Sequence, residues 1–321
     1  MFTTASVRSI AVGDQVLRTS IRRSRIGRFG HQGRTPLLLI NGIGASLELL
    51  EPFVDALDPA IEVIRFDVPG VGGSPLPTRP YRFTGLCALT ARMLTELGYD
   101  TVDVLGISWG GGVAQHFAAV QRPRCRRLVL VSTATGALMV PAKPSVLAKM
   151  ITPRRYTNRE YLAQVAGSLY GGSARTDPAS ITAAMNAHNR VGSPRGYLYQ
   201  LAAGAGWTSV PFLPLIAQPT LIMSGDDDPI IPLANARIMH RLIPNSTLHV
   251  FNGGHLGLVT EAAELAPVIA EFLAGPVPAK LVTANGAGPP TTSAPPAGLA
   301  KLAWLAWRAW RARRTRIRRE G

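Results

Sequence analysis

Cysteine is scarce in this sequence, and its scarcity excludes a disulfide framework. The 321 residues include only two cysteines, Cys87 and Cys125. Small disulfide-stabilised domains need several cysteine pairs, and disulfides persist mainly in oxidising compartments. We therefore interpret both cysteines as buried structural thiols of a protein that works in a reducing compartment.

Long apolar runs are also missing. Nowhere do roughly 20 uncharged apolar residues follow one another, as a membrane-spanning helix requires. The first eight residues, which end with Arg8, do not lead into the apolar run of a signal peptide either. We therefore expect a cytoplasmic protein.

Charged residues are few, and they are unevenly distributed. They make up 17% of the chain, against about 25% in an average protein. The apolar fraction of 46% predicts a folded protein with a sizeable core. Residues 275–321 account for +8 of the net charge of +15, because they contain nine lysines and arginines and one acid, Glu320. The basic character of the C-terminal end therefore need not describe the rest of the chain.

The C-terminal end divides into two predicted segments. Residues 275–298 are rich in proline, glycine, alanine and threonine, which predicts a disordered linker. Residues 299–321 predict a basic amphipathic helix, whose apolar side contains Leu299, Leu302, Ala303, Ala306 and Trp310. Because three tryptophans stand beside seven arginines here, one hypothesis is contact with an anionic membrane or a granule surface. A merely solvated basic tail is the alternative, and no specific nucleic acid is expected as a partner.

The pattern of apolar residues predicts the fold class. Two β-rich runs, residues 7–12 and 16–22, flank Gly13-Asp14 and predict a hairpin. Short continuous apolar runs predict strands buried on both faces at residues 37–40, 61–66, 102–105, 128–131, 220–223 and 248–251. Segments long enough for helices lie between several of them, such as 85–97 and 111–122. This alternation predicts an α/β fold with a mostly parallel central sheet that helices cover on both faces.

Residues 136–215 interrupt this alternation. They are rich in proline, glycine, tyrosine and arginine, and they contain helical patches instead of buried strand runs. The alternation resumes at residue 219. We therefore predict that residues 136–215 form a cap inserted into a core made of residues 1–135 and 216–274. Insertions of this kind lie at the carboxyl ends of strands, where ligands bind.

The strongest chemical signal is Gly106-Ile107-Ser108-Trp109-Gly110, directly after a predicted strand. A Gly-x-Ser-x-Gly sequence at this place forms a sharp strand-to-helix turn that holds the serine in a strained conformation. The turn exposes the hydroxyl at a helix N-terminus, where backbone N–H groups favour a developing oxyanion. The pattern therefore predicts that Ser108 is a catalytic nucleophile in an α/β-hydrolase fold.

A serine nucleophile needs a base, and the base needs an acid that orients it. His255 lies in the glycine-rich loop Asn252-Gly253-Gly254 that follows the last predicted strand, so we predict that it is the base. The other five histidines are interpreted as surface or packing residues: His31, His116, His188, His240 and His249. Asp226, Asp227 and Asp228 follow the strand at 220–223, which yields the chain order Ser, Asp, His that this fold uses. We predict Asp228 as the acid, because Pro229 holds it extended at the entry of the loop.

The tetrahedral intermediate of acyl transfer needs two hydrogen-bond donors. The backbone N–H of Trp109, directly after the nucleophile, is the first candidate. The loop after the first central strand reads Asn41-Gly42-Ile43-Gly44, and the N–H of Ile43 is the second. The nearby glycine-rich loop 67–74 lacks the spacing of a dinucleotide-binding loop, so we interpret it as a structural turn.

The chain resembles the intracellular poly(3-hydroxyalkanoate) depolymerases of the medium-chain-length type over roughly residues 8–275. The motifs that carry this resemblance are Asn41-Gly42-Ile43-Gly44-Ala45, residues 66–74, Pro80-Tyr81-Arg82-Phe83, Ser108-Trp109-Gly110-Gly111, Pro153-Arg154-Arg155-Tyr156, Tyr170-Gly171-Gly172, Gly206-Trp207-Thr208-Ser209 and residues 225–232. Several of them lie inside the predicted cap and are therefore more specific than the general hydrolase pattern. The basic tail after residue 275 departs from the family pattern.

The resemblance implies hydrolysis of a storage polyester on granules inside the cell, without a metal or an organic cofactor. The triad of the family corresponds to Ser108, Asp228 and His255. Trp207 and Tyr170 are predicted to line an apolar channel for alkyl side chains, with packing in the core as the alternative. A carboxylesterase or thioesterase that acts on small acyl substrates is the rival function. A surface-binding protein that acts through residues 299–321 is the rival from another class.

Overall fold

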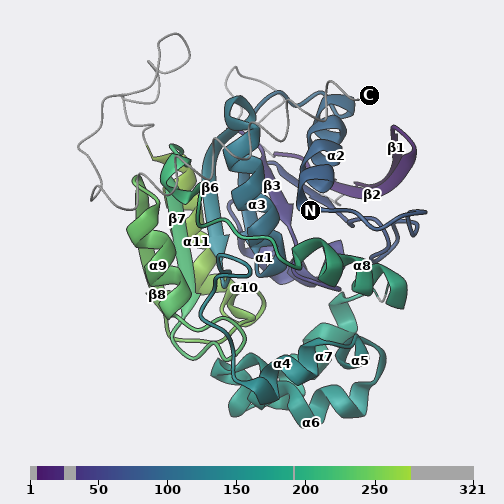
Figure 1. Ribbon diagram of the computed structural model, residues 1–321, viewed down its shortest axis with the longest axis vertical. Coiled ribbons are helices and arrows are strands. Elements are labelled where there is room, and N and C mark those ends of the chain that lie inside the picture. The colour runs from purple at the N-terminus through teal and green to yellow at the C-terminus, as the bar shows by residue number, and fades with distance from the viewer. Residues whose placement is uncertain (1–5, 25–33, 191, 276–321) are drawn as a thin grey trace.

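A computed structural model describes residues 6–24, 34–190 and 192–275. The predicted helix at 299–321, and the predicted linker beyond its first residue, lie outside the described residues. Within the described ranges, eight strands form one sheet in the order β1-β2-β4-β3-β5-β6-β7-β8 (Figure 1). The strands are β1 (Ser6–Val12), β2 (Gln15–Arg22), β3 (Leu37–Ile40), β4 (Val63–Phe66), β5 (Val102–Ile107), β6 (Cys125–Val131), β7 (Thr220–Gly225) and β8 (Ser246–Phe251).

The direction of the strands confirms the predicted fold class. β1 pairs with β2 and β2 with β4 in antiparallel orientation, and the remaining neighbours are parallel. Strand β6 begins three residues earlier than the apolar run predicts, because Arg126 and Arg127 belong to it. Arg126 forms an ion pair with the buried Asp103 of β5, which allows a charged residue to lie within the sheet.

Helices pack against both faces of the sheet because successive strand residues point to opposite sides. Leu37 and Leu39 of β3 belong to one buried cluster, which includes α1 (Glu51–Ala56) and α11 (Ala262–Ala274). Leu38 and Ile40 belong to the other cluster, with residues from α2 (Phe83–Glu96), α3 (Trp109–Val120) and α9 (Ala234–Leu242). Short elements complete these layers: η1 (Leu47–Leu50), η2 (Arg122–Arg124), η4 (Leu213–Leu215) and α10 (Gly257–Thr260). As predicted, Cys87 and Cys125 are free and buried.

The chain between β6 and β7 contains a group of helices, most of which lie together at one end of the molecule in Figure 1, with α8 apart from the rest. They are α4 (Pro144–Met150), α5 (Arg154–Thr157), α6 (Arg159–Tyr170), η3 (Gly172–Arg175), α7 (Pro178–His188) and α8 (Pro194–Gly204). The side chains of Asn158 and Asp177 accept backbone N–H bonds at the starts of α6 and α7, which is how polar residues begin helices. Hydrogen bonds join this segment to the loops that follow β3, β7 and β8 at the carboxyl ends of these strands.

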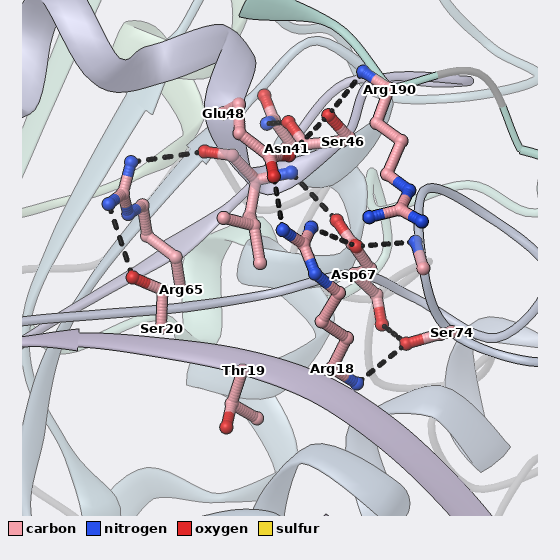
Figure 2. A network of polar contacts seen from close by, with 12 residues as sticks. Arg18, Thr19, Ser20, Asn41, Ser46, Glu48, Arg65, Asp67, Ser74 and Arg190 are labelled. Atoms are coloured by element: carbon pink, nitrogen blue, oxygen red, sulfur yellow. Dashed lines mark hydrogen bonds and ion pairs between the residues drawn. The ribbon is translucent and has the colours of Figure 1, made fainter. Parts of the chain in front are cut away.

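A buried carboxylate organises the loop that follows β4. One oxygen of Asp67 accepts the N–H of Leu47 at 2.7 Å. The other accepts the N–H of Gly73 at 2.8 Å and the Arg18 guanidinium at 3.0 Å. Figure 2 shows Arg18 between Asp67 and Glu48, with which it also forms an ion pair. This network agrees with the interpretation of residues 67–74 as a structural turn.

We expect Asp67→Asn to lower the free energy of unfolding by about 3 kcal/mol, because it removes the charge of one partner in a buried ion pair. The amide also cannot serve all three donors, since its NH2 group must face at least one of them in either orientation. Urea unfolding of the two proteins measures the difference. Arg34→Ala is the control, because its ion pair with Asp58 is exposed and such pairs contribute about 0–1 kcal/mol. Equal losses in both variants would contradict the structural role of Asp67.

Candidate active site

Ser108 lies at the junction between β5 and α3, in a backbone conformation that residues with a side chain rarely adopt. Its φ is 54° and its ψ is −123°. Its N–H donates to the carbonyl of Val131 at 3.0 Å, and its carbonyl accepts from the Thr133 hydroxyl at 2.7 Å. These bonds to β6 and the turn after it hold the strained turn in place.

The two glycines of the Gly-x-Ser-x-Gly motif are required by close packing. A Cβ atom at Gly106, near the end of β5, would clash with the carbonyl of Gly110 in the first turn of α3. A Cβ atom at Gly110 would clash with the carbonyl of Ile40 at the end of β3. The motif therefore lets α3 start directly against the central strands, which brings Ser108 to the carboxyl end of the sheet.

His255 lies between Ser108 and Asp228. Its Nε2 is 3.0 Å from Ser108 Oγ, and its Nδ1 is 2.8 Å from Asp228 Oδ2. The Asp228 side chain is fully buried and that of His255 is 6% exposed. The backbone N–H of His255 donates to the carbonyl of Tyr170 at 2.7 Å, so the helical segment between β6 and β7 helps to hold the histidine loop. This arrangement can transfer a proton from the serine to the histidine while the carboxylate orients the ring.

The three neighbouring aspartates have different partners. Asp228 faces His255, and its Oδ1 accepts the N–H groups of Ile230 and Ile231 at 2.9 Å each. Asp226 accepts the N–H of Gly253 at 3.0 Å. Asp227 pairs with Arg175, and this hydrogen-bonded ion pair holds the pKa of the Asp227 carboxyl below its usual value. Of the three, Asp228 is the one placed to orient His255.

The loop that contains Ile43 lies against the serine. A Cβ atom at Gly42 would lie 3.5 Å from Ser108 Cβ. Within the described part of the chain the N–H of Ile43 forms no hydrogen bond, whereas that of Gly44 donates to the Gln200 side chain. Trp109 is the first residue of α3, and N–H groups at this position have no partner inside the helix. Among the described residues, neither N–H group has a hydrogen-bond partner, which is what the prediction of an oxyanion site requires.

Trp207 and Tyr170, the predicted substrate-binding residues, lie in packed surroundings. The Trp207 ring contacts Phe83 with 4.7 Å between the ring centroids, and its Nε1 lies 3.4 Å from His116. The Tyr170 side chain is 3% exposed and belongs to the same buried cluster as α1 and α11. Burial raises the pKa of the Tyr170 hydroxyl, which keeps the group neutral. Their part in binding substrate stays a prediction.

Sequence reasoning assigned no chemistry to a group of aromatic residues beside the Ile43 loop. A cleft lies between this loop and helices α5 and α8, and its lining includes Gly44, Tyr156, Thr157, Pro194 and Tyr197. The Arg155 side chain lies behind them, 4.4 Å above the ring of Tyr156, and donates to the Tyr197 hydroxyl at 2.9 Å. Pro153-Arg154-Arg155-Tyr156 stood out in the sequence as a family motif, but no spacing rule connects it with residue 43.

No group of three or more histidine, cysteine, aspartate or glutamate side chains in residues 6–24, 34–190 and 192–275 is arranged to hold a metal ion. None of the helices in these ranges combines the length and the apolarity that crossing a bilayer requires.

Comparisons with known proteins identify the fold and the family. The sequence profile of the alpha/beta hydrolase fold matches residues 35–262. The chain is 50% identical over 266 residues to the poly(3-hydroxyalkanoate) depolymerase of Ectopseudomonas oleovorans, which covers 83% of this chain and 92% of that protein. It is 25% identical over 234 residues to 3-oxoadipate enol-lactonase 2 of Acinetobacter baylyi, covering 73% of this chain and 86% of that one. The crystal structure of the enol-lactonase from Burkholderia xenovorans LB400 superposes with a TM-score of 0.71 at 23% identity, over 84% of this chain and all of that one.

Proposed function

The chain belongs to the alpha/beta hydrolase fold family and, within it, to the poly(3-hydroxyalkanoate) depolymerases, and we propose that it cleaves the ester bonds of an intracellular poly(3-hydroxyalkanoate) with Ser108 as its nucleophile. The observation that carries this proposal is the joint position of Ser108, His255 and Asp228 in a chain that is 50% identical to such an enzyme. The predicted α/β-hydrolase fold is confirmed by the same family match.

The proposed reaction has two halves. Ser108 Oγ attacks the ester carbonyl carbon while His255 Nε2, at 3.0 Å, takes its proton. The N–H groups of Ile43 and Trp109 bind the oxyanion, and His255 then gives the proton to the departing hydroxyl end of the polymer. A water molecule, deprotonated by His255, next attacks the acyl-serine. This step releases a 3-hydroxyacyl product with a free carboxylate and restores the serine.

We assign residues 1–135 and 216–274 to the hydrolase core and 136–215 to a cap over the site. The contacts of this segment support the assignment. The Gln200 side chain accepts the N–H of Gly44, and the carbonyl of Tyr170 accepts the N–H of His255. The N–H of Gly172 donates to the Asp227 carboxylate at 2.8 Å. These bonds connect the proposed cap to the loops that carry Ile43, Asp228 and His255.

The proposed partner is the surface of a polyester granule inside the cell. Exposed apolar side chains in the proposed cap support this choice: Leu138 is 63% exposed, Leu147 43% and Ile151 62%. Such residues suit contact with an apolar polymer surface. Additional attachment through residues 299–321, which lie outside the described residues, stays a hypothesis that granule pelleting with and without residues 276–321 tests.

Hydrolysis of three substrates tests the proposed function. We expect the purified protein to clear amorphous granules of a medium-chain polyester faster than granules of a short-chain one, and also to hydrolyse a p-nitrophenyl ester. Release of 3-hydroxy acids and loss of turbidity measure the first two reactions. Hydrolysis of the p-nitrophenyl ester alone would favour a carboxylesterase or thioesterase and contradict the polymer as substrate.

A further inference from the structure

The peptide group that joins Ile43 to Gly44 is held at both ends by the proposed cap. The Tyr156 hydroxyl of α5 donates to the Ile43 carbonyl at 2.8 Å. The Gly44 N–H donates to Oε1 of Gln200, in α8, at 2.7 Å. A peptide group is planar, so two hydrogen bonds at opposite edges fix the orientation of the whole plane. This peptide group is the next along the chain after the one that carries the N–H of Ile43, the proposed oxyanion donor.

Gln200 also contacts the second proposed donor residue. Its backbone carbonyl accepts the indole N–H of Trp109 at 2.8 Å. The Gln200 side chain is buried, and its Nε2 has no hydrogen-bond partner among the described residues. The amide orientation follows from the Gly44 N–H, which needs an oxygen as its acceptor. The side chain of Gln200 therefore has one described hydrogen bond, and that bond ends on the Ile43 loop.

The opposite side of the loop is held by the core. Asn41 Nδ2 donates to the Ser46 carbonyl at 2.6 Å, as Figure 2 shows, and the N–H of Gly42 lies 3.2 Å from Asn41 Oδ1. Between these anchors stand Gly42 and Gly44, and glycine leaves the backbone free to rotate. Gly44 has a φ of 73°, and a Cβ atom there would lie 2.5 Å from the Tyr156 ring. Within the loop the Gly42 carbonyl, which belongs to the same peptide group as the Ile43 N–H, accepts the N–H of Ala45 at 3.3 Å. Tyr156 and Gln200 add two shorter bonds to the next peptide group.

We propose that Gln200 and Tyr156 are positioning residues that hold the Ile43 N–H toward Ser108, so that the oxyanion site is complete only when the cap is seated on the core. This inference rests on the proposed function, because it concerns the same serine and the same oxyanion donors. It links two parts of the chain: the nucleophile and the base come from the core, whereas the orientation of the oxyanion loop depends on residues from α5 and α8.

The variants Gln200→Leu, Tyr156→Phe and their combination test the proposal with a soluble p-nitrophenyl ester. Tyr156→Phe keeps the ring beneath the Arg155 guanidinium and removes the hydroxyl, and with it the long bond of 3.5 Å from Arg155 Nη2. Gln218→Leu is a matched control, because Gln218 is also buried, donates one hydrogen bond to a backbone carbonyl and has one amide atom without a partner among the described residues.

We expect each of the two variants to lower kcat by about 10- to 100-fold, the scale at which small misplacement of catalytic groups acts. KM should change little, because the oxyanion forms only after the ester has bound. The inhibition constant of a boronic acid, which forms a tetrahedral adduct with the serine, should rise by the same factor as kcat/KM falls.

The pH dependence of kcat/KM should stay as in the wild type, since His255 and Asp228 are untouched. The double variant should lose less than the product of the two single losses, because both bonds hold one peptide group.

Two results would overturn the proposal. One is that Gln200→Leu loses no more activity than Gln218→Leu at a similar loss of thermal stability. The other is that activity falls while affinity for the boronic acid is kept. A separate comparison identifies failure of the proposed function: if hydrolysis of the p-nitrophenyl ester by the wild type does not depend on Ser108, the nucleophile itself is wrong. If the reaction depends on Ser108 and the variants match their control, only the positioning role fails.

Discussion

Replacing Ser108 by alanine should lower kcat for ester hydrolysis by about 10⁶-fold, the loss expected when the nucleophile of a triad is removed. The change deletes one oxygen atom, whose described hydrogen bond is with His255 at 3.0 Å. Alanine meets the same backbone strain as serine at a φ of 54°, so the fold should be kept. The activity that remains should come from the oxyanion donors and from binding alone. Initial rates with the p-nitrophenyl ester and with polyester granules measure the loss.

Ser132 provides the matched control for this experiment. It is the other non-glycine residue with a positive φ in residues 6–24, 34–190 and 192–275, it is fully buried, and its hydroxyl has no described hydrogen-bond partner. Ser132→Ala should therefore keep activity within a few-fold of the wild type. Comparable losses in the two variants, or hydrolysis that survives Ser108→Ala, would show that Ser108 is not the nucleophile.

Asp228→Asn should lower kcat by about 10⁴-fold through the wrong tautomer of His255. Asp228 Oδ1 accepts two backbone N–H groups, from Ile230 and Ile231. The oxygen of the asparagine must take this place, and its NH2 group then faces His255 Nδ1. Two donors cannot face each other, so Nδ1 loses its proton and Nε2 carries it instead. A histidine protonated at Nε2 cannot accept the proton of Ser108. Steady-state kinetics of the variant measure the effect.

Asp226→Asn is the control for this prediction. Asp226 stands two residues earlier in the same loop and accepts the N–H of Gly253, and an asparagine oxygen can accept the same bond. Its kcat should stay within about threefold of the wild type, since a retained hydrogen bond costs little. If Asp226→Asn lost as much activity as Asp228→Asn, the acid would not be Asp228 alone.

The sheet and the serine turn were predictable because their signals are local. Residues 37–40 and 128–131 are short apolar runs, and such runs form strands that are buried on both faces. The flanking glycines of Ser108 indicate a sharp turn, and the structure shows which clash each glycine avoids. The apolar run predicts a later start for β6 than the structure has, because Arg126 and Arg127 are charged and do not belong to an apolar run. Their partners, Asp103 and the carbonyl of Gly275, lie far from them in the sequence.

The α/β architecture and the turn that carries Ser108 were predictable because short runs of neighbouring residues specify them. The proposed order of serine, aspartate and histidine came instead from the pattern that this fold uses. The folded structure was needed to reveal how Arg18 meets Asp67, and that Tyr156 and Gln200 hold the loop of Ile43. It also shows that Asp228, the aspartate that Pro229 favoured in the sequence, faces His255. These contacts join residues that are 27 to 156 positions apart. No local pattern encodes such a contact, since it exists only after the sheet and the helices of the proposed cap have packed together.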